Sequence, residues 1–511
     1  MFANIKSLGV YALSGFEVSV EADISGGLPA FTVVGLPDSA VKESTERVHS
    51  SLKNIGFKYP VSRITVNLAP ADIRKTGPVY DLPILLAILC ASEQIRPIPP
   101  HCAFIGELSL DGAVRSVNGV LPMALAAKAA GITQLFVPYD NVSEAAVADD
   151  ITVYGVKSAH EVILHLLGEK PLAPAEKVGF EAALSADVAD FSDVRGQIAA
   201  RRALEIAASG NHNVLLIGPP GTGKSMLAKR LPGILPPLTK QQAIETTKIY
   251  SVAGLMPKNC AIINKRPFRS PHHSVSSAGL AGGGSVPRPG EISLAHNGVL
   301  FLDELPEFHR DTLEILRQPI EDGIVTVSRA AGTVTFPCSI MFIAAMNPCP
   351  CGYFGHPTRQ CSCTQVAIDR YLQRISGPLL DRIDVHVEVS PVDYDEISGE
   401  IGGECSADIL RRVLKAREIQ TKRYEAMGLD ITSNAELPSN VLRTVCKHTP
   451  AAAKMLKGAF ESMGLSARAY DKVLKVSRTI ADLEGAKIID IQHISEAIQY
   501  RSLDRKYWYN R

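Results

Sequence analysis

The chain has 511 residues, of which 46% are hydrophobic and 21% charged, so it holds enough apolar material for several packed cores. Its 53 basic and 53 acidic residues cancel, which excludes a globally basic nucleic-acid coat but not a local basic stripe. The longest apolar run, 82–90, is much shorter than the ~20 residues that span a bilayer, and Glu17 interrupts any N-terminal signal-like stretch. We therefore expect a soluble, cytoplasmic protein without a membrane segment.

Residues 1–166 predict a first domain in which strands and helices alternate. The period-2 pattern of 61–68 is typical of a strand, and 134–138 predicts a second, short strand. The apolar segment 81–92 is compatible with a helix or a strand, and the composition of 121–130 predicts a helix.

The rest of the chain divides at a change of composition. Prolines, scattered acids and many alanines over 167–189 predict a linker between domains. A second α/β pattern follows over 190–391. From 392 to 511 we expect no strands and predict helices over 409–427, 440–463, 466–483 and 490–501. The fold class predicted is thus a multidomain α/β protein with a helical C-terminal domain.

A phosphate-binding loop follows the buried-strand run 214–217. It comprises Gly218, Pro219, Pro220, Gly221, Thr222, Gly223, Lys224 and Ser225, and a helical pattern comes next. This is the G-x-x-x-x-G-K-[ST] motif in its strand–loop–helix context, where backbone N–H groups surround phosphate oxygens. Lys224 would reach the β- and γ-phosphates, and the Ser225 hydroxyl would hold Mg²⁺. The motif predicts ATP and Mg²⁺ as cofactors.

A second apolar run, 298–302, ends in two carboxylates, Asp303 and Glu304. In an open α/β sheet, the carboxyl end of a central strand meets the bound ligand. Asp303 would hold Mg²⁺ through water, and Glu304 would polarise the attacking water as general base. The pair therefore predicts hydrolysis of the nucleotide.

With both motifs in place, the chain resembles the AAA+ ATPases and, among them, the magnesium-chelatase-like ComM/YifB family. The resemblance implies that Asn347, at the end of 343–347, orients the lytic water as sensor 1. It implies that Arg382 is an arginine finger for the neighbouring subunit's γ-phosphate, and that Arg468 is the sensor 2 phosphate contact. A finger acting between subunits implies a ring, which in this family is a homo-hexamer.

Two segments between and after these motifs resemble the family's pore elements. The glycine-rich stretch 266–292 resembles the helix-2 insert, and its composition suits a mobile loop. The alternating segment 323–336 predicts a hairpin that resembles the pre-sensor-1 hairpin. Arg266, Arg269 and Arg329 are the candidate DNA contacts; alternatively, these arginines pair with acids or bridge subunits.

Four cysteines within fifteen residues form a C-x-C-x₉-C-x-C pattern. They are Cys349, Cys351, Cys361 and Cys363. In a cytoplasmic protein this density favours a structural, tetrahedral Zn²⁺ site over disulfides, with free or reactive thiols as the alternative.

Residues 68–81 and 104–121 resemble the proteolytic domain of Lon. In that family a serine nucleophile and a lysine base form the catalytic dyad, but the corresponding positions here are Val79 and Leu121. Since neither side chain can act as nucleophile or base, we expect a Lon-like fold over 1–166 without protease activity.

The resemblance implies a hexameric, ATP-driven motor acting on single-stranded and branched DNA. In this family the activity implied is that of a helicase that promotes branch migration when incoming DNA recombines during natural transformation. One alternative is a magnesium-chelatase-type motor subunit that remodels a protein partner without DNA. Another is a slow nucleotide switch, for which the Glu304 carboxylate would have little use.

Overall fold

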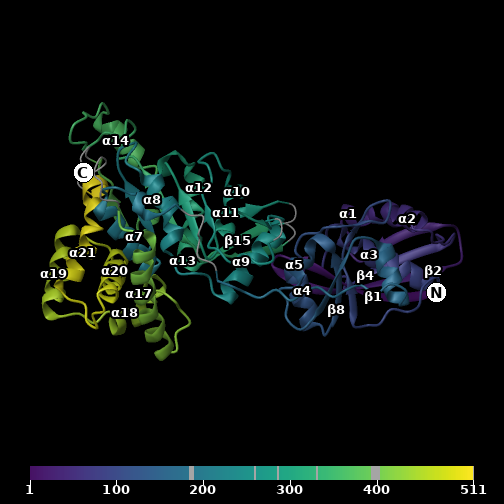
Figure 1. Cartoon of the computed structure of the whole chain (residues 1–511). Coiled ribbons are helices and arrows are strands. Elements are labelled where there is room, and N and C mark those ends of the chain that lie inside the picture. The colour runs from purple at the N-terminus through teal and green to yellow at the C-terminus, as the bar shows by residue number, and fades with distance from the viewer. Residues whose placement is uncertain (183–188, 258–259, 285–286, 330–331, 393–402, 510–511) are drawn as a thin grey trace. The chain divides into compact units, whose positions relative to one another are not determined.

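A computed structural model describes the chain except for residues 183–188, 258–259, 285–286, 330–331, 393–402 and 510–511 (Figure 1). The chain forms two compact units. The first comprises Met1–Glu181 and Lys240–Ile263, and the second comprises Ala182–Thr239 and Asn264–Arg511. Residues 183–188, near the end of the predicted linker 167–189, lie outside the described part. Among the residues described, no helix is both long and apolar enough to cross a bilayer.

A seven-stranded sheet forms the core of the first unit, in the order β3-β4-β2-β1-β5-β8-β9. Strands β1, β2 and β4 pair antiparallel, whereas β3, β5, β8 and β9 join through parallel pairs. The strands are β1 (Phe2–Tyr11), β2 (Ser14–Ser25), β3 (Ala30–Val34), β4 (Arg63–Ala69), β5 (Cys102–Phe104), β8 (Gln134–Pro138) and β9 (Thr152–Val156), with a small separate pair, β6 (Glu107–Leu108) and β7 (Val114–Arg115). The two strands predicted over 61–68 and 134–138 are confirmed as β4 and β8.

Helices cover this sheet. They are α1 (Ser39–Lys42), α2 (Ser44–Asn54), α3 (Asp81–Ala91), α4 (Val120–Ala129), α5 (Val142–Ala145) and α6 (Ala159–Leu167). The ambiguous apolar segment 81–92 is the helix α3, which is buried on nearly every side, so it carries no amphipathic period from which to recognise it. The predicted helix 121–130 is confirmed as α4.

One further helix of the first unit, α9 (Lys240–Ala253), comes from the middle of the second α/β pattern. It docks at the start of α4, where the Gly119 N–H donates to the Ser251 carbonyl oxygen at 3.1 Å. The buried carboxylate of Glu144 accepts from the Ser251 hydroxyl and, at 2.8 Å, from the Leu121 N–H, and burial raises its pKa. The position that would hold a protease lysine is therefore part of a docking point for α9.

The second unit is built on a five-stranded sheet in the order β11-β14-β17-β10-β18, with every pair parallel. Its strands are β10 (Val214–Ile217), β11 (Phe268–Arg269), β14 (Val299–Leu302), β17 (Met341–Met346) and β18 (Val385–Glu388). Strands β10, β14 and β17 are buried along their whole length, as expected for a parallel sheet covered on both faces. Their carboxyl ends lie side by side at one edge.

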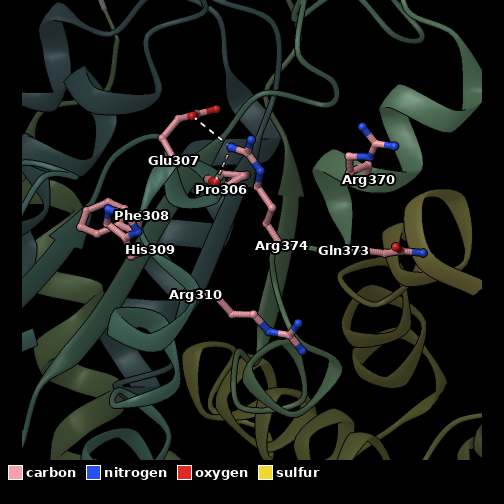
Figure 2. Close-up of a pocket in the computed structure, with 8 residues that line it drawn as sticks. All are labelled: Pro306, Glu307, Phe308, His309, Arg310, Arg370, Gln373 and Arg374. Carbon is pink, nitrogen blue, oxygen red and sulfur yellow. Dashed lines mark hydrogen bonds and ion pairs between the residues drawn. The ribbon is translucent and has the colours of Figure 1, made fainter.

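Short helices and two hairpins surround this sheet. The helices are α7 (Ile198–Gly210), α8 (Lys224–Arg230), α10 (Ser277–Ala281), α11 (Glu291–Leu294), α12 (Arg310–Glu314), α13 (Arg317–Asp322), α14 (Gln365–Leu372) and α15 (Gly377–Leu380). The hairpins pair β12 (Gly282–Gly283) with β13 (Arg288–Pro289), and β15 (Ile324–Arg329) with β16 (Gly332–Pro337), which confirms the hairpin predicted over 323–336. Helix α14 and the turn η5 (Leu305–Glu307) border an open cleft (Figure 2).

The described residues after 402 contain helices and no strand. These helices are α17 (Ser406–Ala426), α18 (Ser439–Val445), α19 (Pro450–Met463), α20 (Ala467–Leu483), α21 (Ile491–Gln499) and α22 (Ser502–Asp504). The single helix predicted over 440–463 is wrong, because α18 ends at Val445 and a new helix begins at Pro450. Proline lacks an N–H and suits the first helical position, and the Thr449 side chain caps the new N-terminus.

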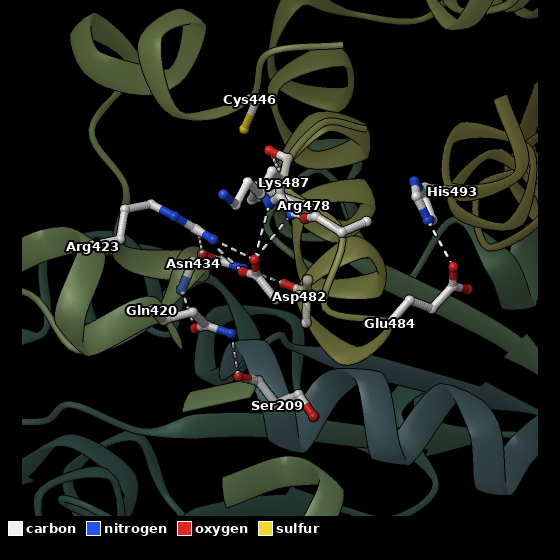
Figure 3. Close-up of polar contacts among 12 residues, drawn as sticks. Ser209, Gln420, Arg423, Asn434, Cys446, Arg478, Asp482, Glu484, Lys487 and His493 are labelled. Carbon is white, nitrogen blue, oxygen red and sulfur yellow. Dashed lines mark hydrogen bonds and ion pairs between the residues drawn. The ribbon is translucent and has the colours of Figure 1, made fainter. Parts of the chain in front are cut away.

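A buried carboxylate, Asp482 on α20, joins the helices of this region (Figure 3). It accepts from Arg423 of α17 at 3.1 Å, from Arg478 one turn earlier at 3.1 Å, and from the Asn434 amide at 3.0 Å. Gln420 continues the network, since its amide donates to the Ser209 carbonyl oxygen of α7 at 3.0 Å. The helical region is thus tied to α7 of the domain built on the parallel sheet through polar contacts.

Replacing Asp482 with alanine should lower the free energy of unfolding by about 3–5 kcal/mol, because it leaves the buried Arg478 guanidinium without its counter-charge. Urea denaturation followed by the fluorescence of Trp508, the single tryptophan, measures this loss. The matched control is Lys422→Ala, which breaks an exposed ion pair on α17. A loss in Asp482→Ala no larger than in the control would contradict the assignment.

Candidate nucleotide-binding site

The glycine-rich loop leaves the carboxyl end of β10 and leads directly into α8. Gly221 and Gly223 have φ values of 80° and 85°, a left-handed conformation that glycine adopts without a steric penalty. The Gly218 N–H donates to the Met346 carbonyl oxygen at 3.2 Å, which ties the loop to the end of β17. The sequence motif therefore folds into a phosphate-binding loop at the edge where three strands end.

Lys224 lies at the centre of the loop and is 8% exposed. Its ammonium group donates to the carbonyl oxygens of Gly218 at 2.7 Å and Pro219 at 2.8 Å, and to the Asn347 side-chain oxygen at 3.2 Å. Burial lowers the pKa of Lys224 to about 8, although Asp303 and Glu304 act in the opposite direction. A buried cation whose hydrogen bonds all go to uncharged oxygens is well placed to receive an anionic ligand.

The two carboxylates after β14 face the same loop. The Ser225 hydroxyl donates to Asp303, which also accepts from the Glu304 N–H at 3.0 Å. A cavity of about 390 Å³ is lined by the loop together with Asp303, Glu304, Met346 and Asn347. The structure thus brings together the predicted residues Lys224, Ser225, Asp303, Glu304 and Asn347. Ser225 and Asp303 offer the oxygen ligands that Mg²⁺ prefers.

Arg382 and Arg468 lie elsewhere in the same unit. Both pair with the carboxylate of Glu321 on α13, Arg468 at 3.3 Å, and all three residues line a separate polar cavity of about 430 Å³. The Arg382 carbonyl oxygen accepts from Asn213, the residue that precedes β10. The pair therefore lies at the amino edge of the sheet, at the opposite end of β10 from the phosphate-binding loop.

The Arg382 side chain is only 15% exposed. Besides the Glu321 pair, its guanidinium donates to the carbonyl oxygens of Arg317 at 3.0 Å and Pro378 at 2.7 Å. These partners lie at the surface and not in the apolar core, and the Glu321 side chain is 45% exposed. To reach another molecule, Arg382 must exchange the Glu321 carboxylate for the new anion.

The four cysteines of the predicted metal site converge. Their sulfur atoms all lie within 4.8 Å of one another, and the three separations among Cys349, Cys351 and Cys361 are 3.4–3.7 Å. A tetrahedral ion with Zn–S bonds of ~2.3 Å requires sulfur separations of about 3.8 Å. The Phe354 N–H donates to the Cys349 sulfur, a contact that favours a thiolate. The donor set and its spacing therefore fit a tetrathiolate metal.

The cysteine cluster packs directly on the phosphate-binding loop. Gly352 has φ of 85°, and a Cβ atom at this position would lie 2.5 Å from Cδ of Pro220. Only glycine allows this approach without a shift of the loop. The cluster thus helps to position Pro220.

Two of the predicted DNA contacts are engaged inside the second unit. The Arg266 guanidinium donates to the carbonyl oxygens of Pro236, Pro237 and Asn297, and burial, followed by repulsion from Arg417, lowers its pKa to about 9. Arg269 makes two hydrogen bonds of 2.7 Å to Glu291. These contacts favour the alternative in which the arginines stabilise the protein. Arg329 lies on β15, and its side chain falls outside the described part.

The stretch 266–292 is also more ordered than its glycine content suggested. It contributes β11 to the edge of the sheet, and it contains α10, the β12–β13 hairpin and α11. Gly282 and Gly290 approach each other so closely that a side chain on either would meet backbone atoms at 2.3–2.4 Å. The glycines at these two positions allow tight packing of the backbone.

Comparisons with known proteins agree with this architecture. Residues 190–397 match the family model "Magnesium chelatase, subunit ChlI", residues 403–501 match that subunit's C-terminal model, and residues 20–141 match "Subunit ChlI of Mg-chelatase". The competence protein ComM of Haemophilus influenzae is 45% identical over 495 residues, covering 96% of this chain and 95% of that protein. The chain belongs to the magnesium-chelatase-like ComM/YifB family. The YifB protein of Escherichia coli is 44% identical, with 96% and 94% covered.

The first unit carries a second, partial likeness. Lon protease 2 of Bacillus subtilis is 33% identical over 134 residues, which are 26% of this chain and 24% of that protein. The family therefore combines a Lon-like N-terminal region with an AAA+ architecture and a helical C-terminus. At the two dyad positions the side chains are apolar and buried, Val79 at 7% exposure and Leu121 at 0%.

The structure adds two residues to the site that the sequence did not identify. His273 lies beside the general-base candidate, with Nδ1 3.7 Å from the Glu304 carboxylate. Glu321 binds both arginines at the opposite edge. His273 belongs to a histidine pair visible in the sequence, whereas Glu321 carries no sequence signal, since it is one of many acids on short helices.

Substituting alanine for Gly352 should push Pro220 out of place and weaken the binding of a fluorescent ATP analogue several-fold, as measured by anisotropy. The matched control is Gly355→Ala. Gly355 also has a positive φ, 76°, but its Cβ would meet only the flexible end of Lys506 at 3.9 Å. Equal affinity in the two variants would show that the contact with Pro220 does not position the loop.

Proposed function

We propose that this protein is an ATP-hydrolysing ring motor that acts on DNA. The convergence of Lys224, Asp303, Glu304 and Asn347 on one cavity carries the proposal, because it supplies a phosphate cation, a magnesium ligand, a general base and a water-orienting amide. Family membership supports the hydrolysis of ATP with Mg²⁺.

The position of the two arginines supports a shared active site. Arg382 and Arg468 lie at the amino edge of the sheet, so they cannot reach the phosphate-binding loop of their own chain at the carboxyl edge. In a closed ring, one subunit's amino edge would face the next subunit's nucleotide. The proposal is a homo-hexamer in which Arg382, and with it Arg468, stabilises the charge that develops on the neighbour's γ-phosphate.

We further propose a structural Zn²⁺ in the cysteine cluster. Four thiolates leave no open coordination position, so the metal would stabilise the connection after β17 without taking part in hydrolysis. Because Gly352 lies against Pro220, this ion would also hold the nucleotide loop in place.

DNA is proposed as the track because the relative from Haemophilus influenzae is named a competence protein. The activity proposed is helicase-driven branch migration as incoming DNA recombines with the chromosome, in the cytoplasm and without proteolysis by the Lon-like unit. A magnesium-chelatase-type motor that remodels a protein partner is the second candidate, favoured by the names of the matching family models. The response to branched DNA distinguishes the two.

Mixing two inactive variants tests the shared site. Arg382→Ala should bind nucleotide but lose hydrolysis by ~10³-fold or more, since it lacks the finger, and Glu304→Gln should be inactive because it lacks the base. In mixed rings, some sites would combine an intact Glu304 with a neighbour's intact Arg382, and part of the phosphate release should return. No recovery at any mixing ratio would contradict the ring.

Branched DNA tests the motor. The unmodified protein should hydrolyse ATP faster with a labelled three-strand junction than without DNA, and should displace the labelled strand at several salt concentrations. Lys224→Ala should abolish both, because the phosphates lose their cation. If DNA does not increase the rate of ATP hydrolysis and no strand is displaced, the result would favour the protein-remodelling alternative.

Elemental analysis tests the cluster. The protein purified without chelator should contain one zinc per chain, and Cys361→Ser should lose most of it, whereas Cys260→Ser, which alters a cysteine outside the cluster, should keep it. Metal-free protein with unchanged nucleotide binding would rule out the proposed ion.

A further inference from the structure

A cleft of about 490 Å³ opens beside the turn that follows Asp303 and Glu304 (Figure 2). It shares no lining residue with the nucleotide cavity. We call it the arginine cleft. One side is formed by η5 and the start of α12, and the other by α14 and the residues after it; the lining comprises Pro306, Glu307, Phe308, His309, Arg310, Arg370, Gln373 and Arg374.

The arginine cleft has an excess of positive charge. Its lining contains three guanidinium groups and a single carboxylate, Glu307, which pairs with Arg374 at 3.1 Å. Arg374 also donates to the Pro306 carbonyl oxygen at 3.1 Å, so its guanidinium is fixed at the edge. Figure 2 shows Arg310 and Arg370 directed away from Glu307, and no ion pair joins either one to another described residue.

Exposed, unpaired guanidinium groups on two facing elements suit the phosphates of a polymer. The planar guanidinium fork matches phosphate oxygens, and an open cleft admits a strand that continues beyond it. The Phe308 ring is 3% exposed, so it offers no face on which a base could stack. Contacts made by the guanidinium groups would therefore follow the phosphate backbone and not depend on base identity.

We propose that the arginine cleft binds the phosphate backbone of single-stranded DNA and reports its presence to the hydrolytic site. This inference rests on the proposed function, and it assigns the DNA contact to Arg310, Arg370 and Arg374. Arg266 and Arg269 form hydrogen bonds within the protein. By contrast, no ion pair joins the exposed guanidinium groups of Arg310 and Arg370 to another described residue, and Arg374 is held at the edge of the cleft by Glu307 and the Pro306 carbonyl oxygen.

The cleft is connected to the hydrolytic site through very short paths. The Glu307 N–H donates to the Glu304 carbonyl oxygen at 2.8 Å, and Glu304 has a φ of 52°, an uncommon conformation that this turn maintains. On the other wall, burial raises the pKa of Tyr371 on α14, and the nearby Asn347 backbone acts in the opposite direction, so the Tyr371 hydroxyl lies close to Asn347. A strand whose phosphates draw Arg374 away from Glu307 would thus shift Glu307 and, through this turn, Glu304, the proposed general base.

The test compares the double variant Arg310→Gln/Arg370→Gln with Arg411→Gln, a control at an exposed arginine on α17. Binding of fluorescein-labelled oligothymidine is measured by anisotropy between about 50 and 200 mM salt. The double variant should bind about tenfold more weakly, and its slope of log K against log salt should be about 1.4 less negative, as expected for two lost phosphate contacts. The ratio of DNA-stimulated to unstimulated ATPase should fall with it, and the control should match the unmodified protein.

Each contrary result has a distinct meaning. If the unmodified protein binds no oligothymidine, the proposed DNA function fails and this inference fails with it. If the unmodified protein binds and the double variant binds equally well, only the inference is overturned. Displacement of the oligonucleotide by equimolar inorganic phosphate would overturn it in favour of a simple anion site. Loss of self-association with DNA binding intact would overturn it in favour of a contact between copies of the chain.

Discussion

The second unit depends on the parallel sheet that places the carboxyl ends of β10, β14 and β17 next to one another. Each strand ends in one part of the site: the phosphate-binding loop, the Asp303–Glu304 pair, and Asn347. Lys224 joins the phosphate-binding loop to Asn347 through hydrogen bonds, and burial of its charge lowers its pKa while Asp303 and Glu304 act in the opposite direction. An anionic ligand with Mg²⁺ would offset the free-energy cost of burying the Lys224 charge. The arrangement of these residues therefore favours an anionic ligand that carries a metal ion.

The sheet also separates Arg382 and Arg468 from the nucleotide loop of the same chain. Since Arg382 and Arg468 lie at the amino edge, a single chain presents a nucleotide loop on one side and two arginines on the other. Glu321 holds both arginines in the isolated chain and would compete with an incoming γ-phosphate. Under the proposed function, assembly and catalysis are then one event, because the phosphate must replace the Glu321 carboxylate.

The loops that follow β14 and β17 carry more than the catalytic residues. The first continues into one wall of the arginine cleft, and the second contains the cysteine cluster and leads to α14, the other wall. Metal, DNA and nucleotide would therefore act on the same two loops. Helix α9 belongs to the first unit. Along the chain, however, it lies between the P-loop helix α8 and strand β11, which both belong to the second unit.

The sequence by itself determined the elements whose signals are local. A strand, a glycine-rich turn and Lys224-Ser225 specify the phosphate-binding loop, the spacing of four cysteines specifies the cluster, and apolar periodicity specifies most helices. The features that depend on contacts between distant parts of the chain were decided only by the tertiary structure. It assigned α9 to the first unit, directed Arg266 and Arg269 to internal acceptors, paired Glu321 with two arginines, and left Arg310 and Arg370 facing an open cleft. An arginine has the same local pattern in each of these settings, because its partner is chosen by residues distant in the chain.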